Sequence, residues 1–296
     1  MTGEKSAKKN RDPIFMVCLA IFLIAAVVVV GTFINDEYLA TGDEKASNGD
    51  TVSVNYTGTF YDEYGGEYAV VFDTSFSSVA NDDDIAKSND FTTKSSYSPL
   101  SFTIGNDTML EMFEDSVIGH KVGDKYDIFI PASQAYVGTI SEGKLNESGN
   151  IMATTTVMTY DAFHTAYPDV EIKDAKGTVS FESKFKWQAN AMMTDNGKSV
   201  IVMYMPETTS YTVYEKGDTK VVYTVTSVAN DQIKYDINVQ NAVVVNDDGD
   251  IQMIKLDLGE KVIYLTNKTG SEFTYKEGAE RVNADLYFHI EVVSIN

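Results

Sequence analysis

The stretch that decides the fold reads Thr51-Val52-Ser53-Val54-Asn55-Tyr56-Thr57-Gly58. Apolar and polar side chains alternate along its first six residues, the period-two pattern of a strand with one face in a core and one in solvent. Similar patterns predict strands over Tyr68 to Phe72, Leu100 to Ile104 and Tyr126 to Ile130, and a closing strand over Ala284 to Ile295. We therefore expect one small β-domain whose two parts are separated by a long insertion.

One short helix is predicted between these strands. Apolar side chains recur at three- and four-residue spacing from Met109 to Ile118. Asn106 or Asp107 can cap the start of this helix, and Gly119 can end it. A single sheet wrapped on one amphipathic helix is an α+β arrangement, which is the fold class we expect.

The segment between the two parts, residues 138–283, is too long to be a structureless loop in a compact domain. Tyr160 to Tyr167 is predicted to be helical. Alternating runs then predict strands over residues 200–204, 211–214, 220–226, 233–237 and 261–265. Asp195-Asn196-Gly197 and Asp247-Asp248-Gly249 are typical of hairpin turns. We expect a β-rich domain inserted over 138–283 between 49–137 and 284–296.

The chain has 296 residues, with 44 Asp and Glu against 23 Lys and Arg, and a formal net charge of −21. Nucleic-acid binding depends on cationic contacts to phosphate, so nucleic acid is not an expected partner. The charge is more typical of a solvated, self-repelling surface. His120, His164 and His289 have no metal-ligand partner at a useful spacing, and we expect no metal site and no cofactor.

Residues 13–35 contain no charged residue and are long enough, as a helix, to cross a bilayer. A buried core helix is one alternative. A cleaved signal peptide is another, although its apolar region is usually shorter and ends at a small-x-small site. We expect an uncleaved transmembrane helix.

Four cationic residues precede this run, within residues 1–12, and acidic residues follow it. The excess of positive charge before the helix predicts a cytoplasmic tail over 1–12, a linker over 36–48 and an extracytoplasmic position for everything beyond, in a single-pass cell-membrane protein. The only cysteine, Cys18, lies inside the apolar run, so packing without disulfides must stabilise the folded part.

Several short motifs outside the middle segment resemble the FKBP-type peptidyl-prolyl isomerases. They occur in the family's order: Gly49 to Gly58, Val71-Phe72-Asp73, Pro99 to Gly105, Val122-Gly123-Asp124, Ile130-Pro131, Gln134-Ala135-Tyr136 and Ala284 to Ile295. The resemblance implies an antiparallel half-barrel wrapped on one short helix. The insertion after Ala135-Tyr136 is similar to FKBPs in which a chaperone domain replaces the flap loop, but it is longer, and residues 246–281 match nothing in that domain. The anchor is similar to long FKBPs of methanogenic archaea.

The resemblance also implies a proline pocket. Its catalytic residues would be Tyr56, Phe72, Asp73, Tyr136 and Phe288, and its further substrate-binding residues Leu100, Met109, Leu110 and Phe113. Phe113 would form the floor, Tyr136 would donate a hydrogen bond to the substrate carbonyl, and Asp73 would either orient Tyr56 or polarise the amide. Turning a prolyl bond means crossing a barrier of about 20 kcal/mol set by amide resonance, and this needs no nucleophile or metal. The expected substrates are proline-containing unfolded or partly folded polypeptides.

The sequence departs from the family pattern at the site. Phe113 stands where tryptophan is more frequent, Met112 where glycine is usual, and the loops over 61–68 and 77–97 are enlarged. The alternative to a working isomerase is therefore an FKBP-like module that keeps its aromatic residues for packing and holds partners at the cell surface.

A second apolar group lies in the middle segment. It consists of Phe185, Trp187, Met192, Met193, Met203 and Met205. Thioether side chains adapt to irregular partners, so an exposed cluster of this kind would bind unfolded chains, as expected of a folding chaperone. The other reading is that these residues form the core of their own domain.

Overall fold

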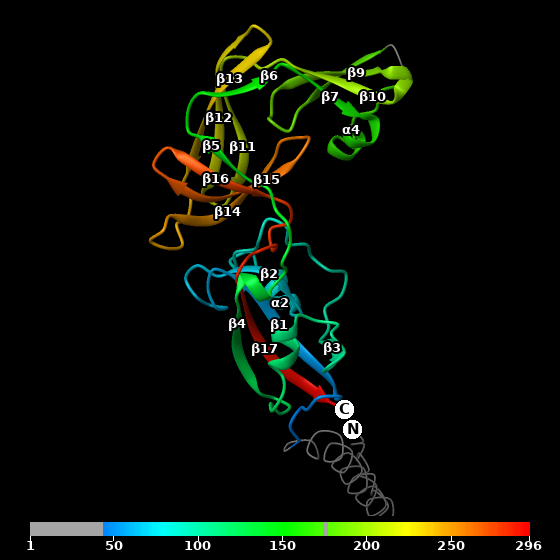
Figure 1. The fold of residues 1–296 in the computed structure, drawn as a ribbon, viewed down its shortest axis with the longest axis vertical. Helices are drawn as coiled ribbons and strands as arrows, with labels where there is room; N and C mark the ends of the chain where they lie inside the picture. The colour runs from blue at the N-terminus through cyan, green and yellow to red at the C-terminus, as the bar shows by residue number, and fades with distance from the viewer. Residues whose placement is uncertain (1–43, 174–176) are drawn as a thin grey trace, which may run out of the picture.

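The computed structural model describes residues 44–173 and 177–296 (Figure 1). The predicted tail and anchor, over 1–12 and 13–35, and most of the linker lie outside the described residues. Within the described ranges, no helix is both long and apolar enough to cross a membrane. The described chain is rich in strands and has few helices.

Five strands from the two ends of the chain form one antiparallel sheet. They are β1 (Thr51–Phe60), β2 (Val70–Thr74), β3 (Leu100–Thr103), β4 (Lys125–Ile130) and β17 (Leu286–Ile295). The order is β2-β1-β17-β4, and β3 pairs with β1 as well. β17 runs beside β1 from the pair Val52 and Ile295 to the pair Thr59 and Tyr287. The predicted strands of this sheet are confirmed.

The helix of this domain, α3 (Glu111–Asp115), is shorter than predicted. Leu110 precedes it with extended dihedral angles and no side-chain cap, so the expected cap at Asn106 or Asp107 is wrong. The buried side chain of Glu114 instead accepts hydrogen bonds from the backbone N–H groups of Gly105 and Asn106. The helix therefore ties down the loop before it, and Phe113 is turned into the core.

The loop between β2 and β3 is enlarged, as its sequence indicates, but it holds a second helix that was not predicted. It contains a short helix, α2 (Ser77–Ala80), with Val79 and Ala80 buried. The rest of the loop, residues 81–99, has no long element of its own and runs back toward β3. This segment, which we call the β2–β3 loop, contacts both the candidate site and the middle segment.

The middle segment, residues 138–283, folds into three four-stranded antiparallel sheets (Figure 1). The first sheet consists of β7 (Thr155–Thr159), β8 (Thr178–Glu182), β9 (Gln188–Thr194) and β10 (Ser199–Tyr204), which lie side by side in the order β7-β10-β9-β8. The second, β11-β12-β13-β6, combines β6 (Asn150–Ala153), β11 (Ser210–Lys216), β12 (Thr219–Ala229) and β13 (Gln232–Gln240). The third, β14-β15-β16-β5, combines β5 (Glu142–Asn146), β14 (Asp250–Asp257), β15 (Val262–Thr269) and β16 (Glu272–Glu277).

The predicted helix is confirmed as α4 (Tyr160–Ala166), and the five predicted strands of the middle segment are present. The turn at Asp195–Gly197 joins β9 to β10, as its sequence indicates. The alternation did not predict β5 to β9, β14 or β16, of which β5 is short and largely polar. Residues 246–281, which had no counterpart in the resemblance, supply most of the third sheet, and β5 completes it.

Two chain segments form the neck between the small domain and the middle segment. Tyr136 and Val282 form an isolated parallel bridge, and the Asn283 N–H donates to the Tyr136 carbonyl at 3.0 Å. The Asn283 side chain accepts from the Gly138 N–H and donates to the Gly138 carbonyl, both at 3.0 Å. In Figure 1 the middle segment stands at one end of the five-stranded sheet, and the C-terminus lies at the other end of that sheet.

Candidate functional site

Four aromatic side chains from four separate elements meet inside the small domain. We call Tyr56 of β1, Phe72 of β2, Phe113 of α3 and Phe288 of β17 the ring cluster. The Phe288 ring centroid lies 5.0 Å from that of Phe113, 5.5 Å from that of Phe72 and 6.3 Å from that of Tyr56. Tyr56 also meets Phe113 edge-on at 6.0 Å. Edge-to-face contacts at such distances are favourable for aromatic rings.

Gly58 leaves the room that these rings need. A Cβ atom at this position would lie 2.5 Å from Cζ of Phe72 and 2.9 Å from Cε1 of Phe288. Both distances are shorter than real Cβ contacts, so any side chain here would push the rings apart. The glycine that follows Tyr56-Thr57 therefore has a steric reason.

Two charged residues, Asp73 and Lys94, adjoin the ring cluster beside Tyr56. The Tyr56 hydroxyl donates a hydrogen bond to Oδ2 of Asp73 at 2.7 Å. The Lys94 ammonium contacts Oδ1 of the same carboxylate at 2.5 Å and lies 5.8 Å from the centre of the Tyr56 ring. Burial, and then the hydrogen bond to Asp73, raise the pKa of Tyr56 well above its ordinary value, so the phenol keeps its proton at every physiological pH.

Tyr136 lies at the neck. Its half-buried side chain packs against the core of the small domain, and the guanidinium of Arg281 lies over its ring, 4.7 Å from the centroid. The contact places a cation from the returning end of the middle segment beside the phenol that the resemblance assigns to substrate binding.

The other expected pocket residues surround the rings. Leu100, Met109 and Leu110 are half-buried and pack against the same core, while Phe113 is only 4% exposed. Phe113 is therefore covered by its neighbours, and almost none of its ring reaches solvent.

Two cavities flank the ring cluster. One, of about 200 Å³, is lined by Tyr56, Lys94, Pro99 and Leu100, among others. The other, of about 300 Å³, is lined by Phe60, Phe72, Thr92, Glu280 and Arg281, among others. A small apolar side chain has space on either side of the rings, and each cavity has a cation in its wall.

The sequence patterns missed three residues of this site. Phe60 stacks on Phe72 with ring centroids 4.8 Å apart. Lys94 lies in the β2–β3 loop, where no motif indicates a role. Arg281 could have been noticed, because it is the only arginine after Arg11 and it precedes the closing strand.

The apolar group of the middle segment divides into two sets. Phe185 and Trp187 stack on each other at 4.8 Å and are buried in the core of that segment, with Trp187 only 1% exposed. The prediction that they contact clients is therefore corrected, because their surface is used for packing. Met193 also packs against this core, whereas Met192 and Met203 are half-buried outside it and Met205 is 47% exposed.

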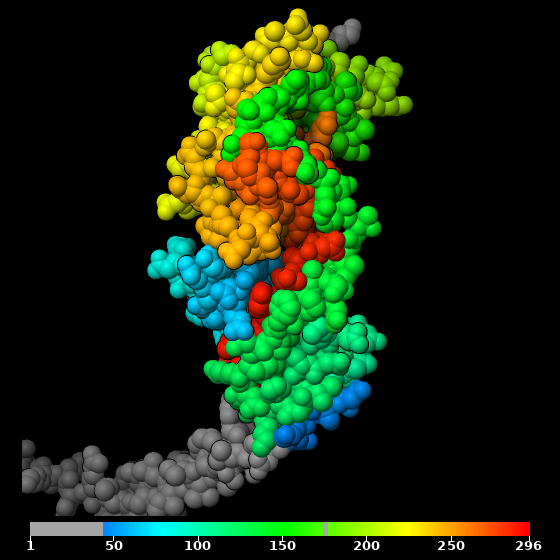
Figure 2. All heavy atoms as spheres, turned by 60° about the vertical axis from the view of Figure 1, so that its left-hand side comes forward, coloured from blue at the N-terminus to red at the C-terminus, as the bar shows by residue number. Residues whose placement is uncertain are grey.

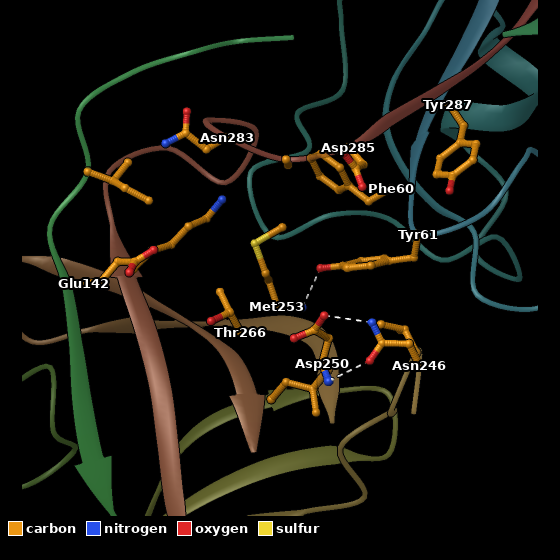
Figure 3. A pocket seen from close by; sticks show the side chains of 15 residues that line it. Phe60, Tyr61, Glu142, Asn246, Asp250, Met253, Thr266, Asn283, Asp285 and Tyr287 are labelled. Atoms are coloured by element: carbon orange, nitrogen blue, oxygen red, sulfur yellow. Dashed lines mark hydrogen bonds between the residues drawn. The ribbon is translucent and has the colours of Figure 1, made fainter. Parts of the chain in front are cut away.

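A larger cavity lies elsewhere, between the small domain and the third sheet of the middle segment. It has a volume of about 550 Å³, and its described lining includes none of the ring cluster (Figure 3). Figure 3 shows the Tyr61 side chain of the small domain extending toward Met253 of the third sheet. The Tyr61 hydroxyl accepts a hydrogen bond from the Met253 N–H at 2.8 Å. Glu142, Asp250 and Asp285 also line this cavity. Over residues 44–173 and 177–296, no cluster of His, Cys, Asp and Glu has the arrangement of a metal site.

A family comparison bears on the small domain. Residues 42–158 match the FKBP-type peptidyl-prolyl cis-trans isomerase family. The matched range includes every FKBP-like strand except β17, which pairs with β1 from the far end of the chain. The match therefore covers most of the small domain, apart from β17, and the first part of the middle segment, residues 138–158.

The chain is also similar in sequence to a peptidyl-prolyl cis-trans isomerase. The short-type peptidyl-prolyl cis-trans isomerase of Methanocaldococcus jannaschii is 35% identical over 66 residues. The similarity covers 22% of this chain and 39% of the relative's length. It therefore concerns a part of each protein.

Proposed function

We propose that this protein is a peptidyl-prolyl cis-trans isomerase that acts at the ring cluster. One observation carries the proposal: four rings from β1, β2, α3 and β17 converge beside the hydrogen-bonded pair Tyr56 and Asp73, in a domain that matches the isomerase family. Flanking cavities of about 200 and 300 Å³ offer space for a proline and its neighbours.

The chemistry needs only a suitable environment. The barrier of about 20 kcal/mol arises because twisting the amide removes its resonance. Water stabilises the planar, polar amide more than the twisted one, so apolar walls that exclude water favour the transition state. Phe72 and Phe288 form such walls, and the hydroxyl of Tyr136 can donate to a client carbonyl. The bond from Tyr56 to Asp73 fixes the orientation of the Tyr56 ring.

An isomer-specific fluorescence assay on a proline tetrapeptide tests the proposal. Phe72→Ala and Tyr136→Phe should each lower the catalysed rate while the circular dichroism spectrum stays unchanged. Tyr160→Phe, on α4 in the middle segment, is the matched control and should keep the rate. A wild-type rate no higher than the uncatalysed one would contradict the proposal.

We further propose that the middle segment holds unfolded client chains on one face of its first sheet. On β10, Val200 and Val202 are fully buried, so Ile201 and Met203 face away from the core. Ile201 pairs with Val157 of β7, which is 62% exposed, and with Met192 of β9. These side chains and Met205 form an apolar strip across three strands, which we call the outer strip.

The outer strip suits an extended client because apolar and thioether side chains accept varied partners. Val157→Lys and Ile201→Lys should weaken suppression of client aggregation, and Thr226→Lys, an exposed site on β12, should not. Tetrapeptide turnover should stay the same in all three variants. Full suppression by both strip variants would contradict this role.

A binding module without catalysis is the second candidate. It is favoured by the close packing of Phe113, which leaves little of its ring for a substrate. The fluorescence assay separates the two, because a binding module would bind proline peptides with no gain in isomerisation rate.

We propose an extracytoplasmic site of action for the folded domains, with residues 13–35 as a single membrane anchor. The uncharged run and the cationic residues before it support this position. A protease added to intact cells should then degrade the segment after residue 44. Protection of that segment in intact cells, with digestion after lysis, would contradict it.

A further inference from the structure

The side chain of Arg281 lies beside the ring cluster. It is exposed at the neck, its guanidinium covers the Tyr136 ring at 4.7 Å, and it lines the cavity of about 300 Å³ that Phe72 also lines. Among the described residues, no hydrogen bond or ion pair engages its five N–H donors. A cation with unused donors therefore stands at the rim of the ring cluster.

Two carboxylates share that cavity, and both have other partners. Asp90 accepts from the Lys255 ammonium at 2.7 Å and from the Tyr264 hydroxyl at 2.6 Å. Glu280 accepts from the Asn89 side chain at 2.8 Å and from the Asp90 N–H at 3.0 Å. Lys94, the cation of the other cavity, is paired with Asp73. Within the part of the chain that the structure describes, Arg281 is thus the cation of this site that has no carboxylate partner.

We propose that Arg281 makes the site select clients with an acidic residue next to the proline. The inference rests on the proposed isomerase function and names its substrate class. A guanidinium binds a carboxylate through two parallel hydrogen bonds, with more geometric specificity than an ammonium. The chain as a whole has a net charge of −21 and repels acidic segments, so an unpaired cation at the rim provides local attraction where the proline must enter.

The test uses the full chain and two tetrapeptide series. One varies the residue before proline among Glu, Gln and Lys, and the other varies the residue after it. At low salt, kcat/KM for the Glu peptide should exceed that for the Gln peptide by about threefold to tenfold in at least one series, as expected of an accessible ion pair. Salt should reduce this ratio.

The variants then assign the preference to one side chain. Arg281→Gln should bring the Glu-to-Gln ratio close to one, and Arg281→Lys should keep part of it. Lys144→Gln, an exposed cation on β5 paired with Glu272, is the charge-matched control and should keep the wild-type ratio. A ratio near one in both series for the wild type, or a preference that survives Arg281→Gln, would overturn the inference and leave the isomerase proposal standing. No turnover of any peptide would overturn both.

Discussion

The Tyr264 hydroxyl of the third sheet donates a hydrogen bond to the Asp90 carboxylate of the β2–β3 loop at 2.6 Å, across 174 positions of sequence. Four residues further along the loop, Lys94 contacts Asp73 beside the ring cluster. Asn89, on the same loop, donates to the Met253 carbonyl at 2.6 Å. Figure 2 shows the blue-to-cyan part of the chain, which includes this loop, against the orange part. One loop therefore joins the middle segment to the candidate site.

The bond between Asp90 and Tyr264 should contribute measurably to stability. In a double-mutant cycle with Asp90→Ala and Tyr264→Phe, we expect a coupling energy of about 1–3 kcal/mol in urea unfolding, because hydrogen bonds to charged groups are among the stronger ones. The exposed pair Ser210 and Thr224, 2.9 Å apart, is the control, and Ser210→Ala with Thr224→Val should couple by less than about 0.5 kcal/mol. Additive effects at Asp90 and Tyr264 would show that the contact does not hold the two parts together.

The pH dependence of stability should reveal Glu280. Burial, partly offset by the hydrogen bond from Asn89, raises the pKa of this carboxyl above its ordinary value of 4.5. The folded state then holds a proton that the unfolded state has lost, so the contribution of Glu280 to stability is greatest below pH 4.5 and falls as the pH rises through the folded pKa. Glu280→Gln does not titrate at this position. The unfolding free energy of this variant minus that of the wild type should therefore increase as the pH rises above 4.5. Parallel curves for the two proteins would contradict this.

Gly58→Ala should displace two side chains of the ring cluster. Its new methyl group meets Phe72 and Phe288 at distances that force both rings to move. We expect a loss of about 1–3 kcal/mol in stability, typical of overpacking, and a fall in kcat/KM of about tenfold or more. Ser53→Ala, on the other face of β1, should change the unfolding free energy by less than about 0.5 kcal/mol and keep the rate. Unchanged turnover by Gly58→Ala would show that catalysis does not depend on the arrangement of the ring cluster.

Trp187 should act as a core residue. Its indole is buried, and Nε1 has no hydrogen-bond partner among the described residues. Trp187→Ala should cost about 3–5 kcal/mol through the cavity it leaves, whereas Trp187→Phe should cost about 1–2 kcal/mol, because it keeps most of the apolar volume and removes an unpaired donor. Chemical unfolding followed by circular dichroism measures both values. Equal costs would contradict the core role of this side chain, because phenylalanine keeps much of the apolar volume that alanine removes.

The sequence determined the strands of the small domain. Alternation along Thr51 to Tyr56 and along the closing strand is a local property with a period of two, so it can be seen without knowing what lies opposite. The residues of the ring cluster were also named from the sequence, through their positions in family motifs. The length of α3 was not, because the buried Glu114 replaces a local cap with contacts to Gly105 and Asn106.

Only the tertiary structure decided the contacts between distant segments. Asp90 and Tyr264 have no spacing that relates them, and neither do Lys94 and Asp73. The same reason explains Trp187 and Met205, which look alike in sequence as apolar neighbours of one hairpin, although the first is buried and the second exposed. Local pattern fixes which side chains share a face, whereas the packing of that face against another sheet fixes which of them reach solvent.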